Sequence, residues 1–250
     1  RSISADSSHN WSEAFIWTPE GGMVGLGFMP GGSGSNFSEA YGVSADGSVI
    51  IGVSKNRPGT SGGEEAFRWT VGDGMVGLGS LNTNQGSRAV GISANGAVIV
   101  GSSNNGSNAE GFRWASGVMT GLGDLPGGNT SSAVQGFNPI SANGTVIVGN
   151  SHSNHSGAGN GQEAFRWASG VMTGLGDLPG GNLNSVARGI SADGLVIVGN
   201  SNSSSSTPFL EAFRWTTDDG MIALGDLPGG SFFSNALGAN SDGSIIVGFG

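Results

Sequence analysis

The stretch RWASGVMTGLGDLPGGN occupies residues 113–129, and the same seventeen letters return at residues 166–182. Two identical copies in one chain indicate an internal repeat, and the repeat is the first feature to settle because it determines the architecture. The stretch contains tryptophan, aspartate and a Gly-Gly pair, which often occur at functional sites. We nevertheless predict that most of it is scaffold, because the remainder of the chain repeats the same pattern in weaker form.

The wider motif is Glu-Ala-Phe-Xaa-Trp, which occurs five times, once with glycine in place of alanine. The tryptophans that end the five copies are Trp17, Trp69, Trp114, Trp167 and Trp215. Their spacings are 52, 45, 53 and 48 residues, with a mean of 49.5. Five such periods account for nearly all of the 250 residues.

One period contains four short segments that have the properties of β-strands. Residues 87–93 alternate small and apolar side chains, and residues 97–101 form a β-branched run typical of a strand buried on both faces. Asn95-Gly96 between them is a strong signal for a two-residue hairpin turn. Two further segments follow, at residues 110–114 and 118–123. Since no segment shows a sustained 3.6-residue apolar period, we expect almost no helix.

A period near 50 residues with four antiparallel strands is typical of a propeller blade. The chain begins with the last two strands of a period and ends with the first two. We therefore predict an all-β, five-bladed β-propeller in which the N- and C-termini each supply two strands of one shared blade. This arrangement would cover strand edges that are otherwise exposed. The expected single domain spans residues 1–250, with blades at 234–250 plus 1–30, 36–82, 86–128, 131–181 and 184–230.

We name the strands of a blade A to D in chain order. The A–B turns are short and uniform, whereas the B–C loops vary in length and lie on the same face as the D–A connections that carry DLPGG. Binding residues tend to lie on variable loops above a rigid scaffold, so this variable face is the predicted binding surface. The candidate ligand-binding residues on it are Trp11, Phe37, Asn129, Asn182, Phe232 and Phe233.

The composition excludes several classes of function. The net charge is −9, with only nine Lys and Arg residues, so there is no basic surface to bind nucleic acid or an anionic membrane. There is no cysteine, which removes thiol nucleophiles and thiolate metal sites. No apolar run reaches the 18 residues that a spanning helix needs. The chain starts at Arg1 without a signal peptide or an initiator methionine, and we expect it to be a processed form or an excised segment.

The repeated polar and aromatic residues are interpreted as structural. A tryptophan present in every period meets the demands of a repeated packing interface, although a ring of sugar-stacking platforms is the alternative. The strand-C arginines and the aspartates of the DLPGG segments are expected to form ion pairs within blades. No unique carboxylate pair or Ser–His–Asp set stands apart from the repeat, so we predict that the protein is not an enzyme. No cofactor or metal is predicted, with Ca²⁺ bound by turn oxygens as an alternative.

The composite unit EAFRWT…GMVGLGDLPGG…S.A.GISADGSVIVG resembles the HAF repeat, a bacterial repeat family regarded as extracellular. The resemblance covers essentially the whole chain. It implies a secreted or surface-displayed bacterial protein, in some cases part of a longer repeat array. The family supplies no catalytic residues to carry over.

Together these observations predict an extracellular binding or adhesion module that recognises glycans or a surface polymer through its variable face. Repeated shallow sites would give avidity from weak contacts. The first alternative is a purely structural domain of the cell surface or matrix, and the second is a hydrolase with its site at the central channel. We expect a monomeric domain that binds no nucleic acid and does not insert into a membrane.

Overall fold

The computed structural model describes residues 12–30, 37–55, 63–83, 85–106, 108–128, 131–153, 161–181, 183–204, 210–229 and 231–250. Within these ranges the chain forms twenty strands in six antiparallel sheets, and no residue is helical. Four of the sheets have four strands in the order A-B-C-D, and two sheets have only two strands. The predicted all-β class and the four-stranded blade are therefore confirmed.

We number the four-stranded sheets as blades 1 to 4. Blade 1 comprises β3 (Ser38–Val43), β4 (Ile50–Lys55), β5 (Glu64–Thr70) and β6 (Gly74–Gly77). Blade 2 comprises β7 (Ser87–Ile92), β8 (Val98–Asn105), β9 (Asn108–Ala115) and β10 (Val118–Gly121). Blade 3 comprises β11 (Ser132–Ala133), β12 (Val146–His152), β13 (Gln162–Ala168) and β14 (Val171–Gly174). Blade 4 comprises β15 (Ser185–Ile190), β16 (Ile197–Ser201), β17 (Glu211–Thr216) and β18 (Gly220–Gly225).

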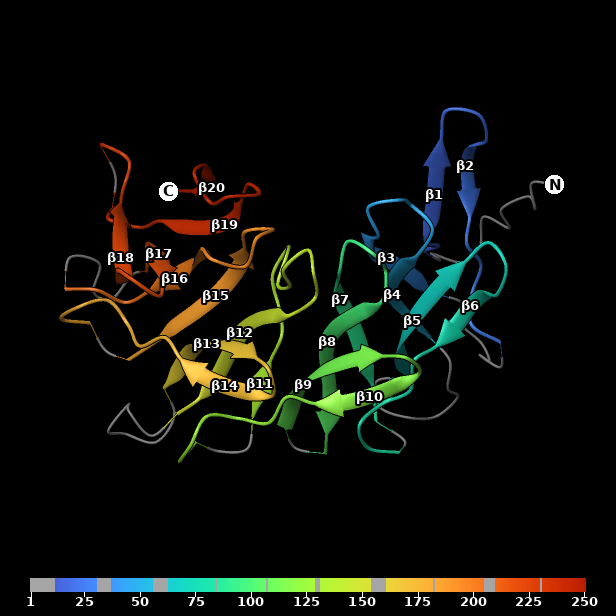
Figure 1. Cartoon of the computed structure of the whole chain (residues 1–250), viewed down its shortest axis with the longest axis horizontal. Helices are drawn as coiled ribbons and strands as arrows, with labels where there is room; N and C mark the ends of the chain where they lie inside the picture. The colour runs from blue at the N-terminus through green and yellow to red at the C-terminus, as the bar shows by residue number, and fades with distance from the viewer. Residues whose placement is uncertain are drawn as a thin grey trace.

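The two remaining sheets lie at the ends of the chain, and the predicted closure between them is wrong. The N-terminal half-blade, β1 (Phe15–Thr18) with β2 (Gly22–Gly25), and the C-terminal half-blade, β19 (Asn235–Ala239) with β20 (Ile246–Phe249), are separate two-stranded sheets. Figure 1 shows them at opposite ends of an open arc of blades. The repeat pattern specifies how one blade packs on the next but not the angle between blades. The pattern alone therefore does not distinguish an arc from a closed ring.

The A–B turns have the backbone conformation that their sequences predict. Gly96, in the turn between β7 and β8, has φ of 70°, in the left-handed region that favours glycine. Each turn also donates a backbone hydrogen bond to the corresponding turn of the next blade. The nitrogen of Ala45 lies 2.9 Å from the oxygen of Ala94, and the nitrogen of Ala94 lies 2.9 Å from the oxygen of Ala142. The turns therefore form a continuous hydrogen-bonded row along the arc.

Blade 3 departs from the regular strand A between residues 132 and 144. Strand β11 has only two residues, and the chain then makes isolated bridges through Asn138 and Ile140. The first strands of the other blades contain a one-residue register shift instead, such as that between Ala89 and Gly91. The irregularity therefore bends strand A without interrupting the order of the blades.

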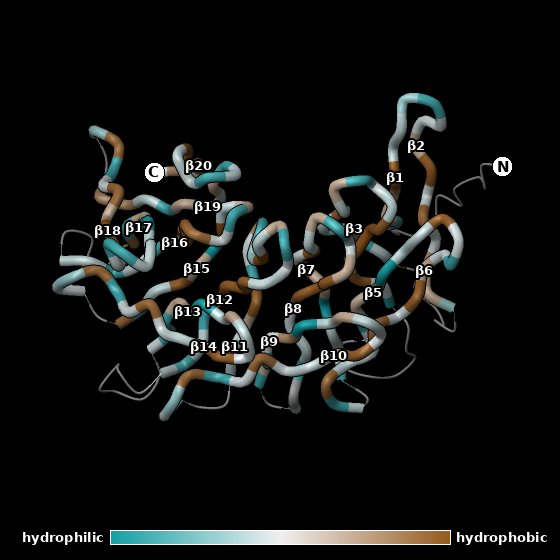
Figure 2. Tube along the Cα trace, in the orientation of Figure 1, coloured by the Kyte–Doolittle hydropathy of each residue, from teal (hydrophilic) through white to brown (hydrophobic). Residues whose placement is uncertain are grey.

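The hydrophobic core lies between neighbouring blades. In Figure 2 the most apolar segments include β8 and β12, which are second strands of their blades, and polar residues concentrate in the turns. Each buried cluster contains side chains from two blades. Trp69, Trp114, Trp167 and Trp215 pack against these clusters, which confirms their predicted role in the wall between blades.

A buried serine at the start of each strand A links its blade to the preceding sheet. Ser185 Oγ donates a hydrogen bond to the carbonyl oxygen of Gly176 (2.6 Å) and accepts one from the nitrogen of Ala164 (2.9 Å). The same pair of bonds is made by Ser38, Ser87, Ser132 and Ser234. Buried backbone groups need such partners, so the serines fix each blade against the one before it.

The predicted ion pairs between strand-C arginines and DLPGG aspartates do not form in the described residues. Arg214 Nη1 instead lies 3.1 Å from Asp219 Oδ2 in the adjacent C–D turn. Ile222 is the cross-strand neighbour of Arg214. Asp226 lies four residues farther along the chain, a distance of about 13 Å in an extended strand. Arg68 makes the equivalent pair with Asp73 at 3.3 Å. The turn aspartate is therefore the arginine's partner because it is nearer.

No helix in the described ranges is long and apolar enough to cross a membrane.

Candidate functional site

The phenylalanine of strand C shows what a complete interface between blades requires. Phe67, Phe112, Phe165 and Phe213 are all fully buried. Phe213 of blade 4 packs in one cluster with Val148 and Leu178 of the preceding blade. Each ring therefore fills the space between its own blade and the blade before it. Burying a phenylalanine in this way stabilises the interface by about 1.5–3 kcal/mol.

The fifth phenylalanine of this series is not buried. Phe15 lies on β1, which pairs only with β2 among the described strands, and 52% of its surface is exposed. Trp17 and Met23 of the same half-blade are also exposed. The N-terminal half-blade thus presents apolar side chains that every complete blade buries fully, as for the phenylalanine, or in part, as for the tryptophan and methionine.

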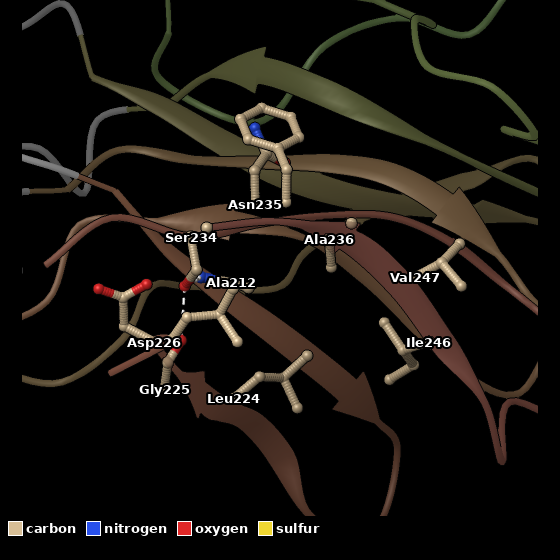
Figure 3. Close-up of a pocket in the computed structure, with 13 residues that line it drawn as sticks. Ala212, Leu224, Gly225, Asp226, Ser234, Asn235, Ala236, Ile246 and Val247 are labelled. Carbon is tan, nitrogen blue, oxygen red and sulfur yellow. Dashed lines mark hydrogen bonds between the residues drawn. The ribbon is translucent and has the colours of Figure 1, made fainter. Parts of the chain in front are cut away.

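In the C-terminal half-blade, β19 and β20 correspond to strands A and B, and no described strand pairs with β20 as a strand C. A pocket of about 390 Å³ lies between this half-blade and blade 4, and we call it the β20 pocket. Figure 3 shows Leu224, Ala212 and Asp226 from blade 4 and its following loop on one side, with Ile246 and Val247 of β20 on the other. The pocket therefore lies where the next blade interface would form.

Comparison of two clusters identifies what the β20 pocket lacks. The cluster between blades 3 and 4 contains Leu175 and Leu178 packed with Phe213. The cluster beneath the C-terminal half-blade contains no phenylalanine. Leu224 and Leu227 occupy the positions of those two leucines in the repeat, yet Leu227 is 68% exposed. We call this apolar space, into which no described strand-C phenylalanine packs and which Phe249 also lines, the vacant phenylalanine site.

The edge of β20 is also open. In blades 1 to 4, strand B pairs with strand C along its length. β20 pairs only with β19 among the described strands. On the face of this sheet, Val247 is 61% exposed, whereas Val198 at the equivalent position in blade 4 is buried in a cluster with Ala236 of the next sheet. An unpaired strand edge beside an apolar pocket is a template for the addition of a strand.

Two acceptor atoms complete the chemistry of the β20 pocket. Asp226 Oδ2 accepts a hydrogen bond from the nitrogen of Phe233 at 3.0 Å. The other oxygen of Asp226, Oδ1, and Oδ1 of Asn235 are buried and have no hydrogen-bond partner among the described residues. Buried acceptors without partners are costly, so a ligand that brings N–H donors would gain affinity here. The site combines apolar walls with unsatisfied acceptors.

The structure brings only some of the predicted site residues to this region. The ring of Phe233 lies 5.8 Å from that of Phe249 beside the pocket, and Phe232 precedes it in the chain. Phe37 is at the other end of the arc, where its carbonyl oxygen accepts hydrogen bonds from Lys55 and Ser54. The remaining candidates lie outside the described residues: Trp11, Asn129 and Asn182.

Sequence reasoning missed Leu224, Asp226, Asn235 and Val247 as site residues. They occupy ordinary repeat positions, so nothing in the sequence separates them from their counterparts in the other blades. The only signal that could have identified them was the half-period at each end of the chain. Their importance comes from the missing neighbour and not from an unusual side chain.

A second polar group lies on strand A of blades 1 and 2. The hydroxyl of Tyr41 donates a hydrogen bond to Glu39, and the Arg88 guanidinium lies 5.4 Å from the centre of the Tyr41 ring. Arg88 also pairs with Glu64 at 3.0 Å. Burial and the hydrogen bond to Glu39 raise the pKa of Tyr41 to about 12. This group holds two neighbouring blades together through charge and ring contacts.

The repeated glutamates of strand C are structural, as predicted for the acidic residues. Glu163 is buried and its Oε1 accepts a hydrogen bond from the nitrogen of Gly176 at 3.0 Å. Glu65 makes the equivalent bond to Gly79. Within the described parts of the chain, no group of three His, Asp or Glu side chains is placed to hold a metal ion.

Comparison with known proteins supports the fold. No model of a known protein family matches the chain, and no curated protein matches its sequence. The structure of a putative TolB from Agrobacterium tumefaciens is similar, with a TM-score of 0.53 and 17% identity over 90% of this chain and 72% of that one. The chain therefore has a β-propeller-like fold. The resemblance to the HAF repeat stays a prediction.

Two further solved structures resemble the chain more weakly. TolB from Acinetobacter baumannii has a TM-score of 0.47 and 14% identity over 81% of this chain and 45% of that one. An S511A mutant of puromycin hydrolase in complex with PGG has a TM-score of 0.47 and 17% identity over 72% of this chain and 27% of that one.

The predicted glycan-binding adhesion module is wrong. The solved structure that shares the fold is a putative TolB, which is not described as a glycan-binding adhesin. The described geometry agrees, because β3, which begins directly after Phe37, and β19, which begins two residues after Phe233, lie in opposite halves of the arc in Figure 1. The residues were grouped on the assumption that the ends of the chain meet.

Proposed function

We propose that this chain is a non-catalytic, protein-binding module of the bacterial cell envelope. It binds an added polypeptide strand that carries an aromatic side chain at the β20 edge. The observation that carries the proposal is the vacant phenylalanine site beside an unpaired strand. Main-chain hydrogen bonds along the edge would supply affinity, and the pocket would select an aromatic side chain.

The pocket chemistry supports a polypeptide ligand over a small polar one. Its walls are mainly apolar side chains from two sheets, and its unsatisfied groups are acceptors. A strand offers both an apolar side chain and N–H donors at regular spacing. The envelope location is part of the proposal and draws support from the TolB-like fold and from the repeat resemblance.

A peptide-binding experiment tests this function. The probe is a labelled peptide with the sequence of residues 162–176, which form the strand C–D hairpin of blade 3 and the two residues after it. The receptor is the Phe15→Ser chain, whose own N-terminal half-blade lacks the ring that would compete for the pocket. We expect saturable binding by fluorescence anisotropy.

The matched control is the same peptide with serine in place of Phe165. We expect its affinity to be at least about tenfold lower, because one buried aromatic side chain contributes more than the 1.4 kcal/mol of a tenfold change. A second control is the Val247→Lys receptor, which places a charge on the pairing edge. Equal binding of both peptides, or no binding of either, would overturn the proposed function.

A further inference from the structure

We propose that Arg188 anchors a binding site for an organic carboxylate on the inner side of the arc of blades. The ligand class is a monoanion that carries an apolar or aromatic group next to its carboxylate. Arg188 lies on β15, within a complete blade, and it does not line the β20 pocket. The site is therefore separate from that of the proposed function.

The backbone of β15 places Arg188 at an exposed edge of its sheet. Strand A forms one edge of each four-stranded sheet, and Figure 1 shows β7 and β15 nearer the inner side of the arc than β10 and β14. The register of β15 against strand B shifts between Ala187 and Gly189, so Arg188 is the extra residue of a β-bulge. Bulges at sheet edges turn the extra side chain in a new direction. The bulge thus presents Arg188 at the inner edge.

The position of Arg188 varies in the repeat while its neighbours do not. In strand A the first, third and fifth residues are serine, alanine or valine, and glycine in every copy, as in Ser185, Ala187 and Gly189. A repeated packing interface keeps such positions constant. The residues at the fourth position are Tyr41, Val90, Gln135, Arg188 and Leu237. Packing between blades does not determine this side chain, which leaves it available to recognise a ligand.

The guanidinium of Arg188 is held in place but has no counter-charge. Its Nε donates a hydrogen bond to Oδ1 of the buried Asn200 at 3.2 Å. Among the described residues this is its one hydrogen bond, and it forms no ion pair with them. Burial lowers the pKa of Arg188, and a partly buried charge without a partner is costly. The two terminal nitrogens remain to bind the two oxygens of a carboxylate.

The strand-A arginine of blade 2 shows the pairing that Arg188 lacks. Arg88 Nη2 lies 3.0 Å from Glu64 Oε2, and the Arg88 guanidinium also lies 5.4 Å from the centre of the Tyr41 ring. The protein therefore neutralises one arginine on this edge with its own carboxylate. The carboxylate of a ligand would supply at Arg188 the charge that Glu64 supplies at Arg88.

Apolar residues adjoin Arg188 on both sides along the inner edge. The backbone nitrogen of Phe137 in blade 3 donates a hydrogen bond to the carbonyl oxygen of Arg188 at 3.2 Å, and Phe137 is 76% exposed. On the other side, a Cβ atom built on Gly189 would lie 2.8 Å from the carbonyl oxygen of Leu237, a partly exposed residue of β19. These backbone contacts bring an aromatic and an aliphatic residue next to the arginine. They favour a ligand whose carboxylate adjoins an apolar group.

The surroundings of Arg188 favour a carboxylate over a phosphate. Phosphate groups on peptides are recognised by clusters of arginines, whereas the residues that contact Arg188, Asn200 and Phe137, are uncharged. A single guanidinium matches the single charge and the two oxygens of a carboxylate. The net charge of −9 on the chain also disfavours a dianion.

An NMR titration of the unmodified chain with N-acetyl-phenylalanine tests the site. We expect saturable shifts of the backbone amide signals of Arg188 and Phe137 as the probe reaches millimolar concentrations. The neutral analogue N-acetyl-phenylalanine amide should bind at least about tenfold more weakly, because it lacks the carboxylate. Inorganic phosphate should also bind more weakly than the acid. Equal binding of acid and amide, tighter binding of phosphate, or no saturable shift would overturn the proposal.

Three variants locate the bound probe. Arg188→Gln should lower its affinity at least about tenfold. Arg214→Gln removes the same charge from a solvent-exposed ion pair of the same blade and should leave the affinity unchanged. Val247→Lys, which places a charge on the β20 edge, should leave it unchanged as well.

Two results with these variants count against the site. Unchanged affinity in the Arg188→Gln chain, or lost affinity in the Val247→Lys chain, would overturn the proposal. The comparison of acid and amide uses the unmodified chain, so it decides the question even if Arg188→Gln does not fold. Peptide binding at the β20 edge is measured with a different probe, so the proposed function is tested separately.

Discussion

Ser185 Oγ donates a 2.6 Å hydrogen bond to the carbonyl oxygen of Gly176, and this bond joins blade 4 to the end of blade 3. The same hydroxyl accepts a hydrogen bond from the nitrogen of Ala164. One buried side chain thus satisfies a donor and an acceptor of the preceding blade. The serine is small and uncharged, and its importance is visible only from its two partners.

Replacement of Ser185 with alanine should lower the free energy of unfolding by about 1–3 kcal/mol, because two buried backbone groups lose their partner. Chemical denaturation measures the change. Ser231→Ala is the matched control, since Ser231 is exposed, and we expect a change within about 0.5 kcal/mol. Equal effects of the two substitutions would contradict the assigned role of Ser185.

The same substitution at two repeat positions should have different costs. Phe213→Ala should destabilise the protein by about 3–5 kcal/mol, because it leaves a cavity between blades 3 and 4. Phe15→Ala should cost less than about 1 kcal/mol in dilute protein, because Phe15 is half exposed. Thermal and chemical denaturation at low concentration provide the comparison. A large loss for Phe15→Ala under these conditions would show that the ring is already buried within one chain.

A strand-B glycine should tolerate no side chain. A Cβ atom on Gly101 would lie 1.9 Å from the carbonyl oxygen of Arg88, so Gly101→Ala should cost about 3 kcal/mol, the upper end of the usual range for overpacked sites. Gly72→Ala is the control, because a Cβ atom on Gly72 would meet no other atom within 4 Å and the φ of this residue is not positive. If both variants unfold at the same denaturant concentration, the close approach of strands A and B is not as described.

The pKa of Tyr41 can be measured without interference, because it is the only tyrosine. Burial and the hydrogen bond to Glu39 raise this pKa from 10.0 to about 12. Glu39→Gln should lower the pKa, while burial keeps it above 10.0. Ultraviolet absorbance of the phenolate gives the titration curve. An unchanged titration curve in the Glu39→Gln chain would show that the Glu39 carboxylate does not raise the pKa of Tyr41.

The raised pKa also fixes the direction of a pH effect. The folded state holds the phenolic proton more tightly than the unfolded state does, so this contribution to stability is complete below pH 10 and is lost as the pH rises from 10 towards 12. The Tyr41→Phe chain should lose stability less steeply over this range. If the free energy of unfolding declines equally with pH in the unmodified chain and in the Tyr41→Phe chain, groups other than Tyr41 cause the loss of stability at alkaline pH.

Much of the fold could be predicted because the repeat makes local signals reinforce one another. Each local signal specified one element: Asn95-Gly96 the turn between strands A and B, the β-branched run after it strand B, and the Glu-Ala-Phe-Xaa-Trp motif strand C. The blade follows from the order of these elements. The closed ring was wrong because its curvature depends on small angles between blades. No residue in the pattern encodes such an angle by itself.

The candidate site could not be predicted for a related physical reason. Asn235, Asp226 and Val247 are ordinary repeat residues in the sequence, and they become a site only where the next strand is absent. Phe233 was identified from its break in the pattern and does lie beside the pocket. The loop residues were predicted from their variability alone, which carries no information on which of them are near one another.

The serine hydrogen bonds also bear on how such a chain can change in length. Every junction between sheets uses the same hydroxyl, carbonyl and amide groups, so any blade presents the same contacts to its neighbour. Duplication or loss of one whole period in the gene would therefore create no junction of a new kind. The identical stretches at residues 113–129 and 166–182 are what a recent duplication of that sort would leave. The number of blades is then free to vary under selection, while the contact between blades is not.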